Sequence, residues 1–428
     1  MPTSSADLQR RYATTRRRIA ALSSLRRVVS LPADRDLIPR QWRVIEAQLT
    51  TREERLAERL KSAGRAHLPL LHESASARKL NVVLGEMEFE LTQAYAFFDT
   101  YMDVLTQRLA PELGRMLAGC DRLAWESIHR DHPALAIVEP PLVYCDRGFG
   151  ASTLREGARL RDGTANPLPL IQIPYSRLSE KCNLTSIFHE VGHEAMVRLG
   201  LVSSLPRALR SALEQAGAPA IIRDFFALWS FEIGPDYWAF GTSGLAAAGA
   251  MREILGLPPA EAFRISGGDP HPPPDLRVLL LTECCRQQWG SGIWDDWERN
   301  WRELYPISEA TGAREVLREC RERLPLVARV LRTTRYRVLG GRCLPELFQL
   351  GALHPARLLP HAADPESPGF RALSPAAQLA VFRLIKERGS LSETELDRVM
   401  TLWLSRLPSR RSIAPPAAIG NMEVLDHA

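Results

Sequence analysis

Two histidines stand four residues apart in the stretch "HEVGH", residues 189–193, and a glutamate directly follows the first. Residues four apart share one face of a helix, so the imidazoles of His189 and His193 can both reach one metal ion. Glu190 lies about 100° around the helix, beside such an ion rather than on it. The HExxH pattern predicts a zinc hydrolase in which the glutamate is the general base. The alternative is a helix with two ordinary, hydrogen-bonded histidines.

The segment that carries this motif is predicted to be a helix. Asn183 is a suitable N-cap, and Gly200 suits the position just past the last turn. The histidines lie off a single apolar stripe, which we expect to face the core. The stripe consists of Leu184, Ile187, Phe188, Val191, Ala195 and Leu199.

A catalytic zinc ion takes three protein ligands and keeps a fourth position open. No third histidine follows closely, because the chain continues "HEVGHEAMVRLG". Glu232 is the preferred third ligand, since Asp236 follows in ExxxD spacing and can fix a ligand histidine from the same helix face. Gly234 and Pro235 interrupt that segment, so we expect its helix to begin close to Ser230.

Two other residues remain candidates for the third zinc ligand. Glu214 follows His193 by 21 residues, within "ALEQAGA". Cys145 precedes His189 by 44 residues, a placement that would resemble the peptide deformylases. The other deformylase motifs are missing from the sequence, which favours a buried structural thiol at Cys145.

A third block, "GGDPHPPPDLRVLLL", contains His271 and Arg277. Its proline run stops the preceding element, and an apolar helix is predicted from Asp275 onward. By itself the block reads as a loop and a helix start.

The three blocks together, HExxH, ExxxD and HPPxxxR in that order, resemble the gluzincin metallopeptidases and most closely the M48-type pattern. The resemblance covers about residues 165–285. It implies zinc held by His189, His193 and Glu232, and Glu190 as the base. It further implies that Asp236 supports the ligands, that His271 lies near the active site and helps to stabilise the oxyanion, and that Arg277 holds the loop. The Gly-Pro pair in "EIGPD" and the missing membrane helices of many M48-type enzymes are departures from the family.

We therefore expect an α+β fold that is predominantly α-helical. A zincin-like catalytic core with a small β-sheet at 131–300 would be flanked by helical regions at 1–130 and 301–428. Two strands are expected before the motif, at "PLVYC" and at Leu170–Tyr175. Helix caps are predicted at Ser374, Gly389 and Ser392, and a loose tail is predicted at 411–428.

The expected function is that of a soluble zinc metallopeptidase acting on a peptide or protein substrate. The strand at Leu170–Tyr175 is expected to pair with an extended substrate. The oxyanion would be stabilised by zinc with His271, Tyr175 or Tyr237. The alternative function is a zinc-binding helical scaffold, or a partner-binding protein, whose HExxH is not catalytic.

Composition narrows the remaining classes. The seven cysteines are odd in number and form no CxxC pair, which argues against disulfides. The chain begins without an apolar signal segment and contains no long uncharged apolar stretch, so we expect a cytoplasmic protein without a transmembrane segment. Arginines cluster near the N-terminus, but net charge is only +5, and we expect a solvated helix face rather than a nucleic-acid site. The oligomeric state is left open. The arginines are Arg10, Arg11, Arg16, Arg17, Arg18, Arg26 and Arg27.

Overall fold

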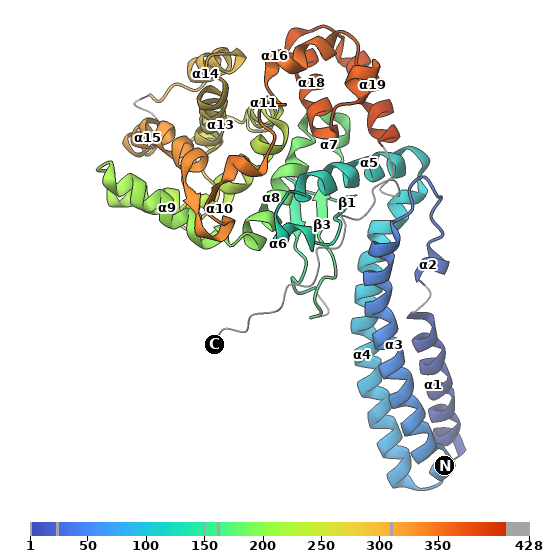
Figure 1. Cartoon of the computed structure of the whole chain (residues 1–428). Helices are drawn as coiled ribbons and strands as arrows, with labels where there is room; N and C mark the ends of the chain where they lie inside the picture. Colours follow the sequence, from blue (N-terminus) through green and yellow to red (C-terminus); the bar gives the residue numbers. More distant parts are fainter. Residues whose placement is uncertain (1, 23–24, 149, 161–162, 309–310, 408–428) are drawn as a thin grey trace.

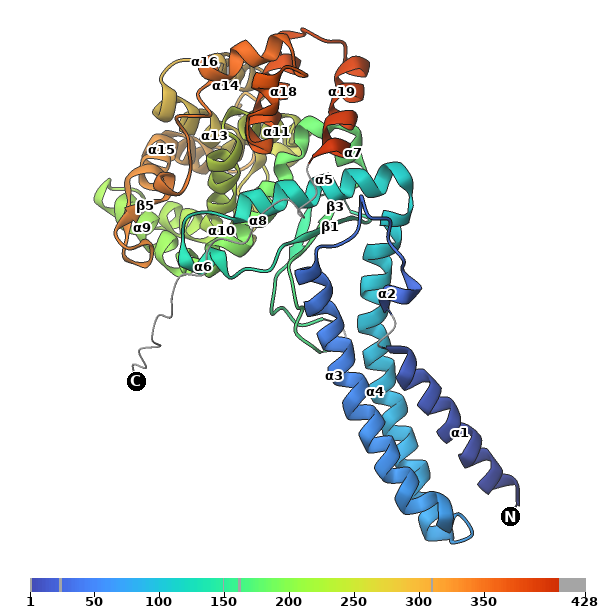
Figure 2. The ribbon, with the colours of Figure 1, turned by 45° about the vertical axis from the view of Figure 1, so that its right-hand side comes forward.

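The structure, a computed structural model, describes residues 2–22, 25–148, 150–160, 163–308 and 311–407. It is mostly helical with a small sheet, which confirms the predominantly α-helical prediction. A long helical arm extends from a rounded head that holds the sheet and the remaining helices (Figures 1 and 2). The tail predicted to be loose, 411–428, lies outside the described residues.

The arm consists of α1 (Pro2–Ala21), α3 (Pro39–His67) and α4 (Ser74–Thr106), which lie side by side (Figure 1). The apolar residues that recur at helical spacing along α3 are all buried against its neighbours. Arg18 of α1 forms an ion pair with Glu88 of α4, so part of the arginine-rich segment stabilises the arm. The buried α3 residues are Trp42, Ile45, Leu49, Leu56 and Leu60.

A buried ion pair joins the arm to the head. The chain turns through η3 (Gln107–Leu109) into α5 (Pro111–Ile128), which begins at a proline because the fixed φ of proline suits the first turn of a helix. Arg108 in the turn is fully buried and lies 2.8 Å from Asp121 of α5. Asp121 also accepts a hydrogen bond from the backbone N–H of Val143, which ties this corner to the first strand.

The sheet of the head has three strands in the order β1–β3–β2. β1 (Leu142–Cys145) and β3 (Leu170–Ile173) are the two predicted strands, and they pair in parallel. β2 (Ser152–Leu154) was not predicted, and it pairs with β3 in the antiparallel sense. The prediction that the strand at Leu170–Tyr175 pairs with substrate is therefore wrong, because β3 is bonded on both edges.

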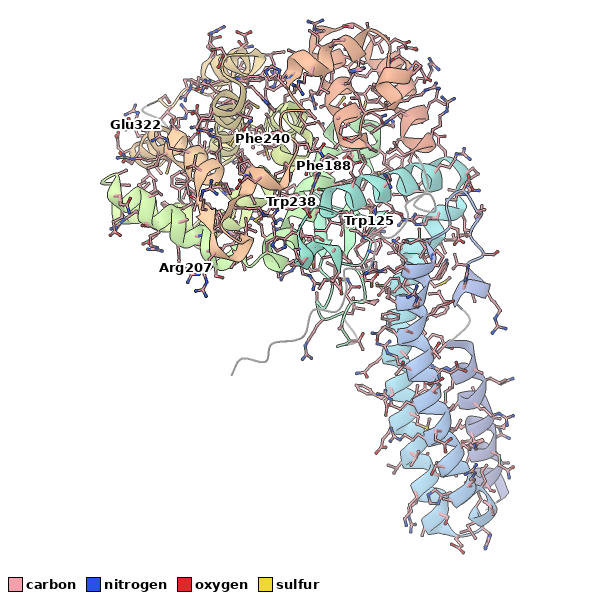
Figure 3. The ribbon with its side chains drawn as sticks, viewed as in Figure 1. Trp125, Phe188, Arg207, Trp238, Phe240 and Glu322 are labelled. Carbon is pink, nitrogen blue, oxygen red and sulfur yellow. The ribbon has the colours of Figure 1, made fainter. Side chains whose placement is uncertain are left out.

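One large core unites the helices of the head, and the labelled Phe188, Trp238 and Phe240 lie inside it (Figure 3). The longer helices around it are α8 (Thr185–Arg198), α9 (Leu201–Gln215), α10 (Ala220–Ser243), α11 (Leu245–Ile254), α13 (Pro274–Trp289), α14 (Ile293–Leu304), α15 (Arg314–Thr333), α18 (Pro375–Arg388) and α19 (Glu393–Arg406). The short ones include α6 (Pro133–Ala136), α7 (Ser176–Ser179), η4 (Lys181–Asn183), α12 (Pro259–Ala262), α16 (Pro355–Leu358) and α17 (Pro368–Arg371), whereas α2 (Leu25–Val28) lies beside the arm (Figure 1). A second small sheet pairs β4 (Arg335–Tyr336) with β5 (Arg342–Cys343).

The C-terminal helices begin and end where their caps were predicted. Ser374 accepts a hydrogen bond from the first turn of α18, Gly389 ends that helix at φ 59°, and Ser392 caps α19. Arg383 of α18 is fully buried and donates to Asn183 of η4 at 2.9 Å. The C-terminal helices thus pack directly on the segment that leads into α8.

Two expectations about the chain as a whole can be compared with the structure. All seven cysteines are free, as the sequence predicted. Among the described residues, no helix has both the length and the apolar character needed to cross a membrane.

Candidate metal centre

The motif residues lie on α8, which begins two residues later than its predicted cap. Asn183 does not cap the helix, because it belongs to η4 and its side chain accepts from Arg383 instead. Gly200 does end the helix as predicted, with φ 66° directly after Leu199. The apolar stripe of α8 is buried in the core, so the opposite face carries His189 and His193 toward a cavity.

The second motif lies on α10, which runs unbroken from Ala220 to Ser243. The prediction that this helix begins near Ser230 is wrong. Pro235 lacks an N–H donor, but packing on all sides holds α10 together through it. A Cβ on Gly192 would stand 2.7 Å from the Cα of Pro235. The two helices therefore cross almost backbone to backbone, and this brings Glu232 beside the histidines.

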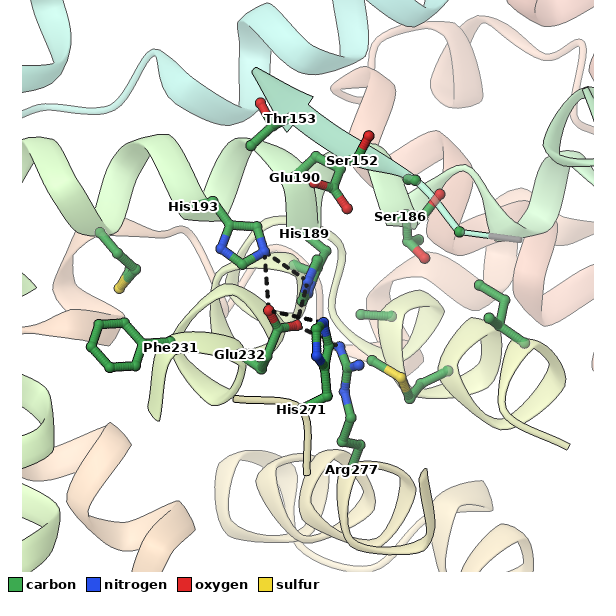
Figure 4. A pocket seen from close by; sticks show the side chains of 18 of the residues that line it. Ser152, Thr153, Ser186, His189, Glu190, His193, Phe231, Glu232, His271 and Arg277 are labelled. Atoms are coloured by element: carbon green, nitrogen blue, oxygen red, sulfur yellow. Dashed lines mark hydrogen bonds and ion pairs between the residues drawn. The ribbon is translucent and has the colours of Figure 1, made fainter. Parts of the chain in front are cut away.

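Two imidazole nitrogens and the carboxylate of Glu232 form a compact triangle at this crossing (Figure 4). Nε2 of His189 lies 3.2 Å from Nε2 of His193 and 3.2 Å from Oε2 of Glu232. Nε2 of His193 lies 3.6 Å from Oε1 of Glu232. Tetrahedral zinc ligands at about 2.0–2.1 Å from the metal stand about 3.3–3.4 Å apart. The triangle has the size of one face of such a coordination sphere.

Glu190 lies next to this triangle, on the side of β2 (Figure 4). His189, Glu190 and His193 each offer a ligand atom within 4.8 Å of the other two, so together they could hold a metal ion. Only 6% of Glu190 is exposed, and this burial raises the pKa of its carboxyl to about 7. The side chain is thus poised to exchange a proton near neutral pH.

Asp236 and Arg277 hold the residues of the triangle in place through hydrogen bonds and ion pairs. Asp236 lies one helical turn after Glu232, and its Oδ1 is 2.8 Å from Nδ1 of His189. Arg277 of α13 donates two hydrogen bonds to Asp236, at 2.8 and 2.7 Å. Burial would raise the pKa of Asp236, but Arg277 and His189 outweigh it and hold that pKa well below its usual range. A permanently charged carboxylate therefore fixes the tautomer that aims Nε2 of His189 at the triangle.

The histidines themselves differ in protonation. Burial would lower the pKa of His189, but its hydrogen bonds with Asp236 and Glu232 outweigh burial and raise the pKa to about 10. Burial and the neighbouring His189 lower the pKa of His193 to about 4. A cation at this site would therefore replace the proton that His189 holds.

His271 lies at the edge of the triangle, in the loop before α13. Its Nε2 is 3.5 Å from Oε1 of Glu232, and its side chain is more than half exposed. Its Nδ1 lies 2.6 Å from Oδ1 of Asp269, a residue that the sequence analysis missed. The spacing of Asp269 two residues before the histidine, in "DPH", was the available signal. Asp269 also accepts from the backbone N–H of His271, so it holds the loop as well as the ring.

The alternative ligands lie elsewhere. Glu214 is exposed on α9 and forms an ion pair with Arg223 of α10. Cys145 lies on β1, its backbone is bonded to Gln107, and burial raises the pKa of its thiol to about 11. Neither residue lines the cavity over the triangle.

The tyrosines proposed for the oxyanion are also absent from the cavity wall. Tyr175 is exposed outside it, and Tyr237 faces the core of the head with 1% of its surface exposed. The prediction of a tyrosine in the site is wrong, because position 237 falls on the face of α10 that points away from the histidines. No tyrosine occurs among the described residues that line the cavity.

The cavity has a volume of about 1140 Å³ and opens over the histidines. The edge strand β2 bounds it on one side, and apolar side chains of α9 and α11 bound its two ends. The lining includes Ser152 and Thr153 of β2, a strand that lies across from the motif residues (Figure 4). Comparisons with protein-family models, curated proteins and solved structures find no match for this chain. Its function is therefore argued from the site.

Proposed function

We propose that this protein is a zinc metallopeptidase with a zincin-like core. The observation that carries the proposal is the triangle of two histidine nitrogens, 3.2 Å apart, and the Glu232 carboxylate, whose two oxygens lie 3.2 and 3.6 Å from them. The three-stranded sheet beside α8, with α10 crossing beneath, supports a zincin-like arrangement.

His189, His193 and Glu232 would hold the metal. Two imidazoles and a carboxylate are the donor set of many catalytic zinc sites, which leave one position open. Glu232 suits the ligand role better than Glu190, because its oxygens complete a triangle of tetrahedral size. When bound, zinc supplies Lewis acidity that polarises a carbonyl and makes water a stronger acid.

Glu190 is the proposed general base. Its buried carboxylate lines the cavity within 4.8 Å of the histidine nitrogens, and with Glu232 as the third ligand it would face a water molecule rather than the metal. It would accept the proton of the attacking water and then deliver that proton to the leaving amine. A carboxyl whose pKa is raised toward neutrality can perform both steps.

His271 is the proposed partner of the developing oxyanion. Its Nδ1 donates to Asp269, which orients the ring with Nε2 toward the cavity beside Glu232, and from there the doubly protonated ring would donate to the oxyanion. A donor fixed in advance of the reaction stabilises negative charge without reorganising. Asp269 would act only through His271, as a positioning residue.

A peptide is the substrate class that the cavity wall favours. β2 is an edge strand, and among the described residues no other strand pairs with its outer edge. An extended peptide can add to such an edge through main-chain hydrogen bonds. Ser152, Thr153 and the apolar ends of the cavity would then contact its side chains.

The decisive experiment compares the wild-type protein with Glu190→Gln. We expect both to bind one zinc ion per chain, and only the wild type to cleave a mixture of peptides followed by mass spectrometry. The loss should be about 100-fold or more, the usual contribution of a general base. A wild-type protein that binds zinc and cleaves nothing would support the zinc-binding scaffold. Undiminished cleavage by the variant would exclude Glu190 as the base.

A further inference from the structure

Arg177 in α7 lines the cavity and has no acidic partner in the part of the chain that the structure describes. Its side chain is half-buried, and its Nε is enclosed without a hydrogen-bond partner among the described residues. Burial alone lowers the pKa of this guanidinium, with no carboxylate to oppose the effect. Arg277, in contrast, has its charge satisfied by Asp236. A half-buried arginine without a counter-charge is ready to bind an anion from outside.

Ser186 supplies a second unused polar group in the same cavity. Its Oγ is buried and has no hydrogen-bond partner among the described residues. Ser186 lies in the first turn of α8, whose positive dipole end therefore faces the cavity together with Thr185. A hydroxyl, a guanidinium and a helix N-terminus in one cavity all favour negative charge.

Outside the proposed catalytic centre, the charged side chains that line the cavity are positive. Glu190 and Glu232 are the only acids among the described lining residues, and both belong to the proposed catalytic centre. Arg155 also lines the cavity, and so does Arg264, which pairs with Glu261. Away from the metal ligands the wall is therefore cationic.

The position of Ser186 indicates which half of a peptide substrate would lie near Ser186 and Arg177. Ser186 lies one turn before Glu190 on α8, on the side away from His193 (Figure 4). Glu190 delivers its proton to the leaving amine, so the residue that follows the scissile bond lies on the Glu190 side of the ligands. That residue would extend from the catalytic centre toward Ser186.

We infer that Arg177 and Ser186 form a binding site for a carboxylate on the leaving half of the substrate. The inference rests on the proposed peptidase function. The carboxylate is either the side chain of an acidic residue after the scissile bond or the C-terminus of the substrate. Both present the same planar anion, which a guanidinium can bind through two parallel hydrogen bonds.

The test uses a cleaved peptide whose scissile bond has been mapped by mass spectrometry. One pair of end-blocked peptides carries Glu or Gln directly after that bond. A second pair ends at that residue with a free or an amidated C-terminus. We expect kcat/KM to favour the carboxylate member of at least one pair by about tenfold or more, as for a charge-assisted hydrogen bond. The pair that shows the preference identifies the source of the carboxylate.

In Arg177→Met that preference should fall to within about twofold of unity, and Arg177→Lys should restore part of it. Arg207→Met is the matched control, because Arg207 points outward from α9 (Figure 3), and it should keep the wild-type ratio. Zinc content and circular dichroism confirm that each variant is folded. Equal rates within both peptide pairs in the wild type, or an unchanged ratio in Arg177→Met, would overturn the inference.

A binding measurement separates this inference from the peptidase proposal. Zinc-loaded Glu190→Gln, with and without Arg177→Met, is titrated by calorimetry with short peptides of fixed sequence, chosen without regard to cleavage, as Glu and Gln pairs and as pairs with a free or an amidated C-terminus. An Arg177-dependent preference for the carboxylate peptide without any wild-type cleavage would sink the peptidase proposal and keep the carboxylate site. Cleavage by the wild type without such a preference would support the peptidase proposal and overturn the carboxylate site.

Discussion

Gly192 of α8 lies so close to Pro235 of α10 that a Cβ on the glycine would meet the proline Cα at 2.7 Å. The two helices carry the histidines and Glu232, so this contact sets the size of the ligand triangle. We predict that Gly192→Ala forces the helices apart, destabilises the fold by about 1–3 kcal/mol as overpacking does, and weakens zinc binding. Urea unfolding and a competitive zinc titration measure the two effects.

Gly85→Ala on α4 is the control for this substitution. Gly85 is also helical, but nothing lies within 4 Å of an added Cβ there. Alanine should stabilise this helix by up to about 1 kcal/mol and leave zinc affinity unchanged. Unchanged zinc affinity in Gly192→Ala would show that the close crossing does not position the ligands.

Glu232→Gln should lose zinc, because an amide oxygen is a much poorer ligand than a carboxylate. We expect affinity to fall by about 100-fold or more, since even supporting residues contribute 10- to 100-fold. Glu214→Gln, an exposed residue on α9, should keep full affinity. Metal content after dialysis against a weak chelator distinguishes the two. Zinc loss in the Glu214 variant alone would refute the ligand assignment.

Asp236→Asn should destabilise the metal-free protein, because the largely buried Arg277 loses its shorter ion pair, 2.7 Å to Asp236, and keeps the longer one, 3.5 Å to Glu232. Breaking a buried ion pair costs about 3–5 kcal/mol. The folded state lowers the pKa of Asp236, so its contribution is present above the ordinary aspartate pKa of about 4 and is lost as pH falls. Urea unfolding should therefore show that the free energy of unfolding falls less between pH 7 and pH 3 in the variant than in the wild type.

The matched control is Asp224→Asn, which removes an exposed ion pair with Arg210. Exposed pairs contribute little to stability, so this variant should follow the wild-type curve. If Asp236→Asn also followed the wild-type curve, the buried ion pair between Asp236 and Arg277 would make no net contribution to stability.

The rate of hydrolysis should rise with pH through the range in which Glu190 loses its proton. Burial raises the pKa of this carboxyl to about 7, and only the deprotonated form can accept a proton from water. A bound divalent cation favours the carboxylate, so the acid limb of kcat/KM should have its midpoint at or below pH 7. A stopped assay between pH 4 and 9 measures it. A rate that falls across this limb as pH rises would contradict a deprotonated base.

The local features of the fold were predictable from the sequence. Helical spacing places His189 and His193 on one face, and the same periodicity predicts the buried face of α3. Proline, glycine and serine signals predict where α5, α18 and α19 begin or end. Each of these depends on residues within a turn or two, so no knowledge of distant contacts is needed.

β2 and the continuity of α10 depended on distant contacts. β2 has three residues and no apolar alternation, so only its pairing with β3 makes it a strand. Pro235 stays inside a helix because the surrounding core holds it there, against its local preference.

The candidate site depends both on local spacing along the chain and on contacts between distant segments. The sequence by itself determined the residue types and the order of the three motifs, because spacing along a helix is local chemistry. Only the tertiary structure decided that Glu232 rather than Glu214 meets the histidines, that Asp269 holds His271, and that Arg177 lines the cavity. Those relationships are distances between elements far apart in the chain, and packing in the core of the head determines them.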